Sequence, residues 1–224
     1  ARSNHAVPRR DRRPPMTDVL VLHDLGETGG DEWAAAFAGW PGRVMAPDLP
    51  GHNGTPPPIG GHYDTGDAVY VALDLLRAEA PGELVVVGVG RNGGAAQVLA
   101  LGGRATGLVL VDGMGGPWLG PAEIDVRQRE MRRRILTTPE ALSSPPPGAL
   151  DPRATMVVGA ADRGFAVRQA AAMPLPVLLI ETPSSPTPDA VDLAEHFAHA
   201  TLTHVDSRDP HRAAQVVRSW WATR

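Results

Sequence analysis

Side chains that can do chemistry follow the apolar runs of this sequence. His23 and Asp24 come directly after the first run, Asp48 after the second and Asp112 after the fourth. The third run leads instead into a glycine-rich turn, and run and turn together cover 84–94 (LVVVGVGRNGG). A glycine-rich turn that opens a helix points backbone N–H groups at one place, where they can stabilise negative charge. The pattern therefore predicts a main-chain anion site at this turn.

Strands that alternate with helices are expected to position these residues. Continuous apolar runs predict buried strands over 17–23, 43–46, 84–87, 107–111, 176–181 and 200–205. Apolar residues at helical spacing predict a helix opening at Asp31 and helices over 64–80, 95–101, 122–136, 165–173, 189–199 and 212–222. Strands that are apolar on both sides are typical of an α/β protein, with a parallel sheet covered on both faces.

Ligands of such sheets bind beyond the carboxyl ends of the strands. The turns expected to ring one pocket are those at His23, Asp48, Gly90, Asp112, Glu181 and Asp206. The segment 117–150 interrupts the alternation with an arginine-rich helix and a proline-rich hinge, which predicts a small cap on a single domain, 16–224. Residues 1–15 carry five arginines and no apolar run, and are expected to be a disordered tail.

Composition excludes several kinds of chemistry. The chain has 224 residues, a net charge of −4 and no cysteine, so it has no thiolate nucleophile or thiolate metal ligand. Every basic residue is arginine, which excludes a lysine Schiff base. No spacing predicts a metal or cofactor site, and the acidic balance gives no reason to expect nucleic acid or a membrane as partner. With neither a membrane-spanning run nor a secretory signal, a cytoplasmic protein is expected.

Four motifs resemble those of the α/β-hydrolase-fold superfamily, in the order and spacing of that fold. Residues 22–26 (LHDLG) resemble the H-G-x-G oxyanion loop, and 48–55 (DLPGHNGT) resemble the D-x-x-G-H-G-x-S turn. Residues 88–93 (GVGRNG) resemble the G-x-S-x-G nucleophile elbow, and 108–113 (LVLVDG) resemble the strand that follows it. The resemblance implies a mostly parallel sheet flanked by helices, with a small helical cap.

The chain departs from this family at the three positions of the catalytic triad. The resemblance places the nucleophile at Gly90, which has no side chain, and the histidine at Arg208. The loop expected to hold the acid contains Ser184 instead. Because a hydrolase needs a nucleophile, a base and an orienting carboxylate, these residues predict loss of the triad. A rearranged set remains open, with His211 as base and Asp112 as its partner.

A backbone oxyanion hole can survive such losses, because its donors are main-chain N–H groups. The expected donors are the N–H groups of Leu25 and Arg91, which could stabilise an enolate oxygen after loss of an α proton. The arginines favour a carboxylate-bearing substrate. The residues expected to bind it are Asp24, Leu25, Gly90, Arg91, Asp112, Met114, Trp118 and Arg208.

In size, composition and triad loss, the chain is also similar to the atypical α/β-hydrolase-fold peptide epimerase of bottromycin biosynthesis. That resemblance implies a cofactor-free isomerase of natural-product (RiPP) biosynthesis, which inverts an α carbon of a modified peptide. The substrate's own carboxylate would move the proton. Two alternatives stay open: a catalytically inactive accessory protein that binds a small ligand, and an esterase-like hydrolase with rearranged residues.

Several other residues have structural interpretations. His23 and His52 are expected to brace the loops in which they lie, and His211 is expected on the exposed surface of the last helix. Trp33 and Trp40 are expected in the core.

Overall fold

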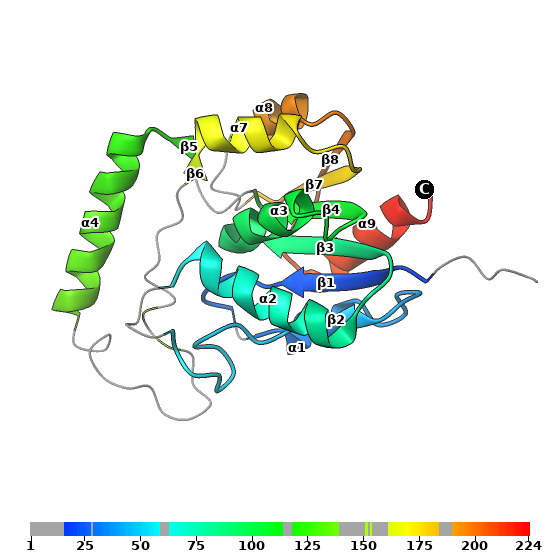
Figure 1. The fold of residues 1–224 in the computed structure, drawn as a ribbon, viewed down its shortest axis with the longest axis horizontal. Coiled ribbons are helices and arrows are strands. Elements are labelled where there is room, and N and C mark those ends of the chain that lie inside the picture. Colours follow the sequence, from blue (N-terminus) through cyan, green and yellow to red (C-terminus); the bar gives the residue numbers. More distant parts are fainter. Residues whose placement is uncertain are drawn as a thin grey trace, which may run out of the picture.

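Six parallel strands form the central sheet (Figure 1). The computed structural model describes residues 16–27, 29–58, 63–113, 118–138, 151, 153, 161–183 and 190–224. The strands lie in the order β2-β1-β3-β4-β7-β8. Their bounds are β1 Asp18–Leu22, β2 Val44–Met45, β3 Leu84–Val89, β4 Gly107–Val111, β7 Val177–Glu181 and β8 Ala200–His204. Every strand pairing in this sheet is parallel, as the continuous apolar runs predicted.

Helices cover both faces of the sheet, so each strand divides its apolar side chains between two cores. Leu20 and Leu22 of β1 face the core with helices α2, α3, α7 and α8, whose bounds are Thr65–Glu79, Gly93–Leu101, Arg163–Ala171 and Ala190–His196. Val19 and Val21 face the opposite core, with α1 (Asp31–Ala36) and α9 (Pro210–Trp221). Burial on both faces explains why the strands have no polar alternation.

The predicted helices are confirmed with small shifts at their ends. Asp64 is the N-cap of α2, where its side chain and that of Asp67 form a reciprocal capping box. The expected helix over 189–199 is shorter, since α8 ends at His196. A second sheet was not predicted: β5 (Trp118–Leu119) pairs in parallel with β6 (Ala161–Asp162). Two-residue strands are too short to carry a hydrophobic pattern.

The arginine-rich helix predicted within the cap is α4, Pro121–Thr137. It has no buried residue, and Figure 1 shows it beside the carboxyl edge of the sheet, apart from the helices that cover the two faces. Residues 117 and 139–150 of the expected cap, and the expected tail 1–15, lie outside the described residues. Across the described residues, no helix combines the length and the apolar character needed to cross a bilayer.

Candidate functional site

The turn after β3 has the tight geometry of the predicted elbow. β3 ends at Val89, a single 3-10 turn covers Gly90–Asn92, and α3 begins at Gly93. A Cβ at Gly88 would lie 2.6 Å from the Cβ of Ala96, so only glycine lets strand and helix pack this closely. Gly90 has φ +52°, a left-handed conformation that also favours glycine. This turn points the N–H of Arg91 toward the end of β1.

The carboxylate of Asp24 occupies the two predicted oxyanion donors. Its Oδ1 accepts hydrogen bonds from the backbone N–H of Leu25 at 2.9 Å and from that of Arg91 at 2.8 Å. The Nε of Arg91 donates to the same oxygen at 3.0 Å. The sequence interpretation assigned these N–H groups to a substrate oxygen and did not anticipate the Asp24 carboxylate between them, and the role of the donors toward a substrate stays a prediction. A side chain of the same loop already holds them.

Arg208 reaches this carboxylate from the loop after β8. Its Nη2 donates to Oδ2 of Asp24 at 3.0 Å, and its Nε lies 3.2 Å from Oδ2 of Asp112 at the end of β4. Asp112 in turn accepts from the backbone N–H and the hydroxyl of Thr182, at 2.9 and 3.0 Å. The expected triad-histidine position is therefore the centre of a chain of alternating charges: Asp112, Arg208, Asp24 and Arg91.

The space above Gly90 is filled by this ion pair. A Cβ at residue 90 would lie 2.4 Å from Cγ of Asp24 and 2.4 Å from Nη2 of Arg208. Real Cβ atoms do not approach other heavy atoms so closely. The absence of a side chain at residue 90 and the contact between Asp24 and Arg208 are therefore parts of one arrangement.

Glu27 is a third carboxylate beside Arg208. Its Oε2 accepts from the backbone N–H of Asp24 at 3.0 Å and from Nε1 of Trp33 at 2.9 Å, and its Oε1 lies 3.8 Å from Nε of Arg208. Burial raises the pKa of Glu27, and the hydrogen bond from Trp33 and the charge of Arg208 oppose that rise. We call these five residues the Asp24 cluster: Asp24, Glu27, Asp112, Arg91 and Arg208. When all five groups are ionised, the cluster carries one net negative charge.

Two buried histidines hold the loops around this cluster. Nδ1 of His23 lies 3.0 Å from the carbonyl oxygen of Asp24, and its Nε2 accepts from the N–H of Leu49. His52 does the same, with Nδ1 2.9 Å from the Pro50 carbonyl and Nε2 accepting from Gly26. In both rings Nε2 is an acceptor, so this geometry fits the neutral form. The expectation that both residues brace their loops agrees with these contacts.

This bracing predicts acid instability. Burial, reinforced by the charge of His52, lowers the pKa of His23 from 6.5 to about 4. Below pH 6.5 His23 is therefore protonated in the unfolded chain and still neutral in the folded chain. The free energy of unfolding should fall by about 3 kcal/mol between pH 6.5 and pH 4. The pKa of His52 is lowered in the same direction by burial. Denaturant unfolding of wild type and His23→Gln at several pH values measures the effect.

The slope of stability against pH should be shallower in His23→Gln than in wild type, although acid-sensitive His52 remains. The control is His211→Gln, because His211 is exposed on the surface of α9. Equal slopes for wild type and His23→Gln would contradict the assignment of the acid sensitivity to His23.

Some predicted residues lie elsewhere. Met114 and Ser184 are outside the described residues. Trp118 lies in β5, where the structure describes its backbone. Asp48 accepts from the N–H of Gly30 and from the Asn53 side chain, which makes it part of the adjoining loop. Trp33 and Trp40 are buried, as expected. Within the described ranges, no group of three or more metal-ligating side chains occurs.

Sequence reasoning missed the position of the Asp24 carboxylate, although a signal was present. The motif His23-Asp24-Leu25-Gly26 has an aspartate where the H-G-x-G loop has its first glycine. A side chain at that position lies next to the two backbone donors and must either turn away from them or bind them. The glycine at residue 90 gives it room to bind them.

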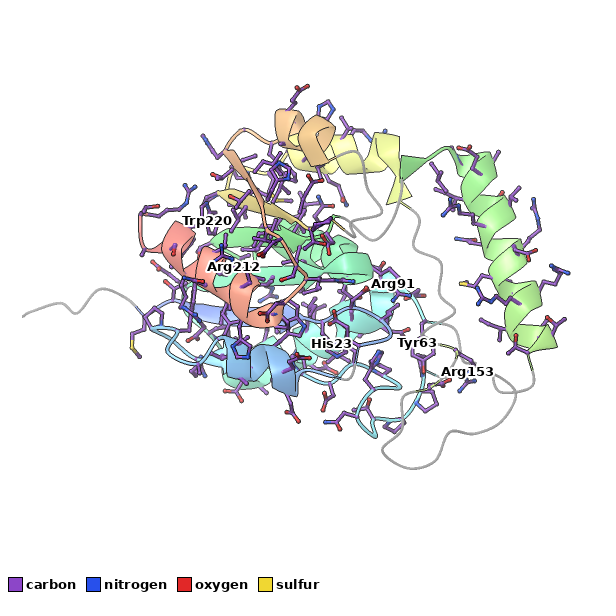
Figure 2. The ribbon with its side chains drawn as sticks, turned by 180° about the vertical axis from the view of Figure 1, so that it is seen from behind. His23, Tyr63, Arg91, Arg153, Arg212 and Trp220 are labelled. Atoms are coloured by element: carbon purple, nitrogen blue, oxygen red, sulfur yellow. The ribbon has the colours of Figure 1, made fainter. Side chains whose placement is uncertain are left out.

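A separate groove lies between β8 and α9. Its volume is about 430 Å³, and its lining includes Thr201, Thr203, Arg212 and Trp220. Figure 2 shows Arg212 and Trp220 at α9 and Arg91 on the side of the sheet nearer α4. None of the charged residues of the Asp24 cluster lines this groove, so the two features are distinct.

Comparisons with solved structures agree with this architecture. A thermophilic esterase from Thermogutta terrifontis, determined with malate bound, has a TM-score of 0.67 and 19% identity, and the match covers 92% of this chain and 90% of that chain. The enol-lactonase from Burkholderia xenovorans LB400 has a TM-score of 0.66 and 18% identity, over 95% and 94% of the two chains. At these identities the likeness concerns the fold.

A thioesterase domain from the curacin biosynthetic pathway is similar to the same extent, with a TM-score of 0.67 and 18% identity over 95% and 93% of the two chains. No curated protein matches the chain. Residues 19–223 match the Alpha/beta hydrolase family, Abhydrolase_6, whose members are generally enzymes. This match spans almost the whole described fold, so the chain belongs to the α/β hydrolase family.

Proposed function

We propose that this protein binds a small ligand at the Asp24 cluster and does not carry out acyl transfer. The observation that carries the proposal is that residue 90 has no side chain and that the ion pair of Asp24 and Arg208 fills the space beside it. In the hydrolase mechanism a serine at this place attacks the substrate carbonyl while backbone N–H groups stabilise the oxyanion. Here the place of that serine side chain and both donors are taken by one ion pair. The favoured role is that of an accessory, ligand-binding member of the family.

The rearranged hydrolase has less support from the geometry. His211 lies at the start of α9, where its backbone N–H bonds the side chain of Asp209 and its ring is exposed. The partners of the Asp112 carboxylate in the described part of the chain are Thr182 and Arg208. No contact among the described residues joins His211 to Asp112, and a base needs such a partner to be oriented.

Ester hydrolysis tests the proposal directly. The purified protein should release p-nitrophenol from p-nitrophenyl acetate and butyrate no faster than heat-denatured protein, and a fluorophosphonate probe should not label it. Saturable turnover that His211→Ala abolishes would overturn the proposal and support the rearranged hydrolase. Turnover that His211→Ala leaves unchanged would overturn it as well, and would point to another nucleophile.

A second candidate is epimerisation at an α carbon of a modified peptide. The feature in its favour is the meeting of two backbone N–H groups and two guanidinium groups at one carboxylate. If Asp24 turned away, the same donors could stabilise an enolate oxygen, which is the charge that forms when an α proton leaves. Incubation of a candidate peptide in D₂O tests this reaction. Protein-dependent deuterium at the α carbon would support epimerisation over simple binding, and no incorporation would count against it.

A further inference from the structure

The carboxylate of Asp24 is bound as a ligand would be. One oxygen accepts from two backbone N–H groups and from Nε of Arg91, and the other accepts from Nη2 of Arg208 and lies 3.5 Å from Nη2 of Arg91. These contacts come from three segments that are distant in sequence: the loop after β1, the turn after β3 and the loop after β8. The receptor part of this arrangement, without Asp24, is two arginines and two main-chain donors.

We propose that the site takes a carboxylate ligand, and that the Asp24 side chain is an internal stand-in which this ligand displaces. The inference rests on the proposed function and adds to it the chemical class of the ligand and a self-occupied state of the empty site. A carboxylate is favoured over a neutral carbonyl because both of its oxygens can accept charge-assisted hydrogen bonds. A neutral carbonyl has one acceptor oxygen and no charge, so it would replace only part of what the Asp24 carboxylate gives the two guanidinium groups.

The charge of the cluster supports an exchange rather than an addition. A ligand carboxylate added beside Asp24 would place four carboxylates around two guanidinium groups. When the ligand replaces Asp24 and the aspartate turns toward solvent, the charge at the donors stays the same. The side chain of Asp24 is 9% exposed, and those of Arg91 and Arg208 are 22% and 31% exposed, so the receptor groups are accessible from the surface.

Removing the stand-in should expose the receptor. An internal carboxylate competes at high effective concentration, so Asp24→Ala should bind acetate at least about 100-fold more tightly than wild type. Titration calorimetry with acetate measures this, and acetamide serves as the neutral probe of the same shape. Asp24→Asn keeps the size of the side chain and removes its charge, so its acetate affinity should lie between the two. Backbone amide signals of Leu25 and Arg91 should shift as acetate is added.

The matched control is Asp18→Ala. Asp18 is another poorly exposed carboxylate of the β1 segment, and it is held by the backbone N–H and the guanidinium of a single arginine, Arg43. Its removal also takes a carboxylate from an arginine, which keeps its pairing with Glu79, and it does not expose the paired donors of the candidate site. Acetate affinity should therefore stay at the wild-type level in Asp18→Ala.

Three results would overturn the inference: equal acetate affinity in wild type and both Asp24 variants, equal gains in Asp24→Ala and Asp18→Ala, or equal binding of acetate and acetamide. If Asp24→Ala fails to fold, Asp24→Asn and the amide shifts of the wild-type protein decide the question. The test is independent of the hydrolysis assay. Ester hydrolysis by the protein would overturn the proposed function. Absence of both ester hydrolysis and acetate binding would overturn only the carboxylate inference.

Discussion

Gly90→Ser is expected to destabilise the protein without turning it into an esterase, although it places serine at the expected nucleophile position. The left-handed φ of +52° disfavours a side chain, and its Cβ would lie 2.4 Å from Asp24 and from Arg208. The left-handed backbone and the displacement of the Asp24–Arg208 ion pair by the new side chain should together lower the free energy of unfolding by about 3 kcal/mol. Denaturant unfolding measures the loss, and p-nitrophenyl acetate tests for activity.

Two further variants separate the causes. Gly103 also has a left-handed φ, +69°, but a Cβ there would meet no atom within 4 Å. Gly103→Ser should therefore lower the free energy of unfolding only through backbone strain, by about 1 kcal/mol. In the double variant Asp24→Gly, Gly90→Ser, part of the crowding is removed, so the two changes should be less costly together than their sum. Two results would contradict crowding by Asp24 and Arg208. One is a double variant whose loss of unfolding free energy equals the sum of the two single losses, and the other is an equal loss in Gly90→Ser and Gly103→Ser.

This coupling shows why the sequence predicted the fold more fully than the site. Strands such as Leu84–Val89 follow from local apolar runs, and the position of Gly90 follows from the strand that precedes it. Sequence interpretation treated residues 90 and 208, with Ser184, as lost members of the catalytic triad and did not predict a contact between them. In the structure the two positions belong to one packed arrangement, in which Asp24 pairs with Arg208 in the space that Gly90 leaves open. Such complementarity depends on side-chain geometry between distant segments.

The helix of the expected cap shows a second limit of prediction from sequence. The pattern of 122–136 predicted a helix, and α4 forms there, yet none of its residues is buried. Helical periodicity predicts where an apolar stripe lies, but it does not say what covers that stripe. Ile124, Met131 and Ile135 are only half-buried, and Val126 and Leu136 are exposed. Sequence therefore located the helix and could not give its packing.

Arg208→Ala is expected to destabilise the protein strongly at neutral pH, because it leaves three carboxylates around an uncharged side chain. Asp24, Asp112 and Glu27 have oxygens at 3.0, 3.2 and 3.8 Å from the Arg208 guanidinium. Removing one partner of a buried ion pair costs about 3–5 kcal/mol, and solvent screening of this 31% exposed side chain reduces the expected loss to about 2 kcal/mol. Denaturant unfolding at pH 7 measures it.

The dependence of that loss on pH identifies its cause. Burial raises the pKa of Glu27, and loss of the Arg208 charge removes one of the effects that oppose this rise. As pH falls toward 5, protonation of Glu27 should relieve the repulsion, so the stability gap between Arg208→Ala and wild type should narrow. Adding Asp112→Asn should recover part of the stability at pH 7, because the amide removes a charge and can still bond Thr182. Arg77→Ala is the surface control, since Arg77 is 76% exposed and pairs with the exposed Asp74. A gap that stays constant with pH, or no recovery in the double variant, would show that Arg208 stabilises the fold by packing and not by joining the three carboxylates.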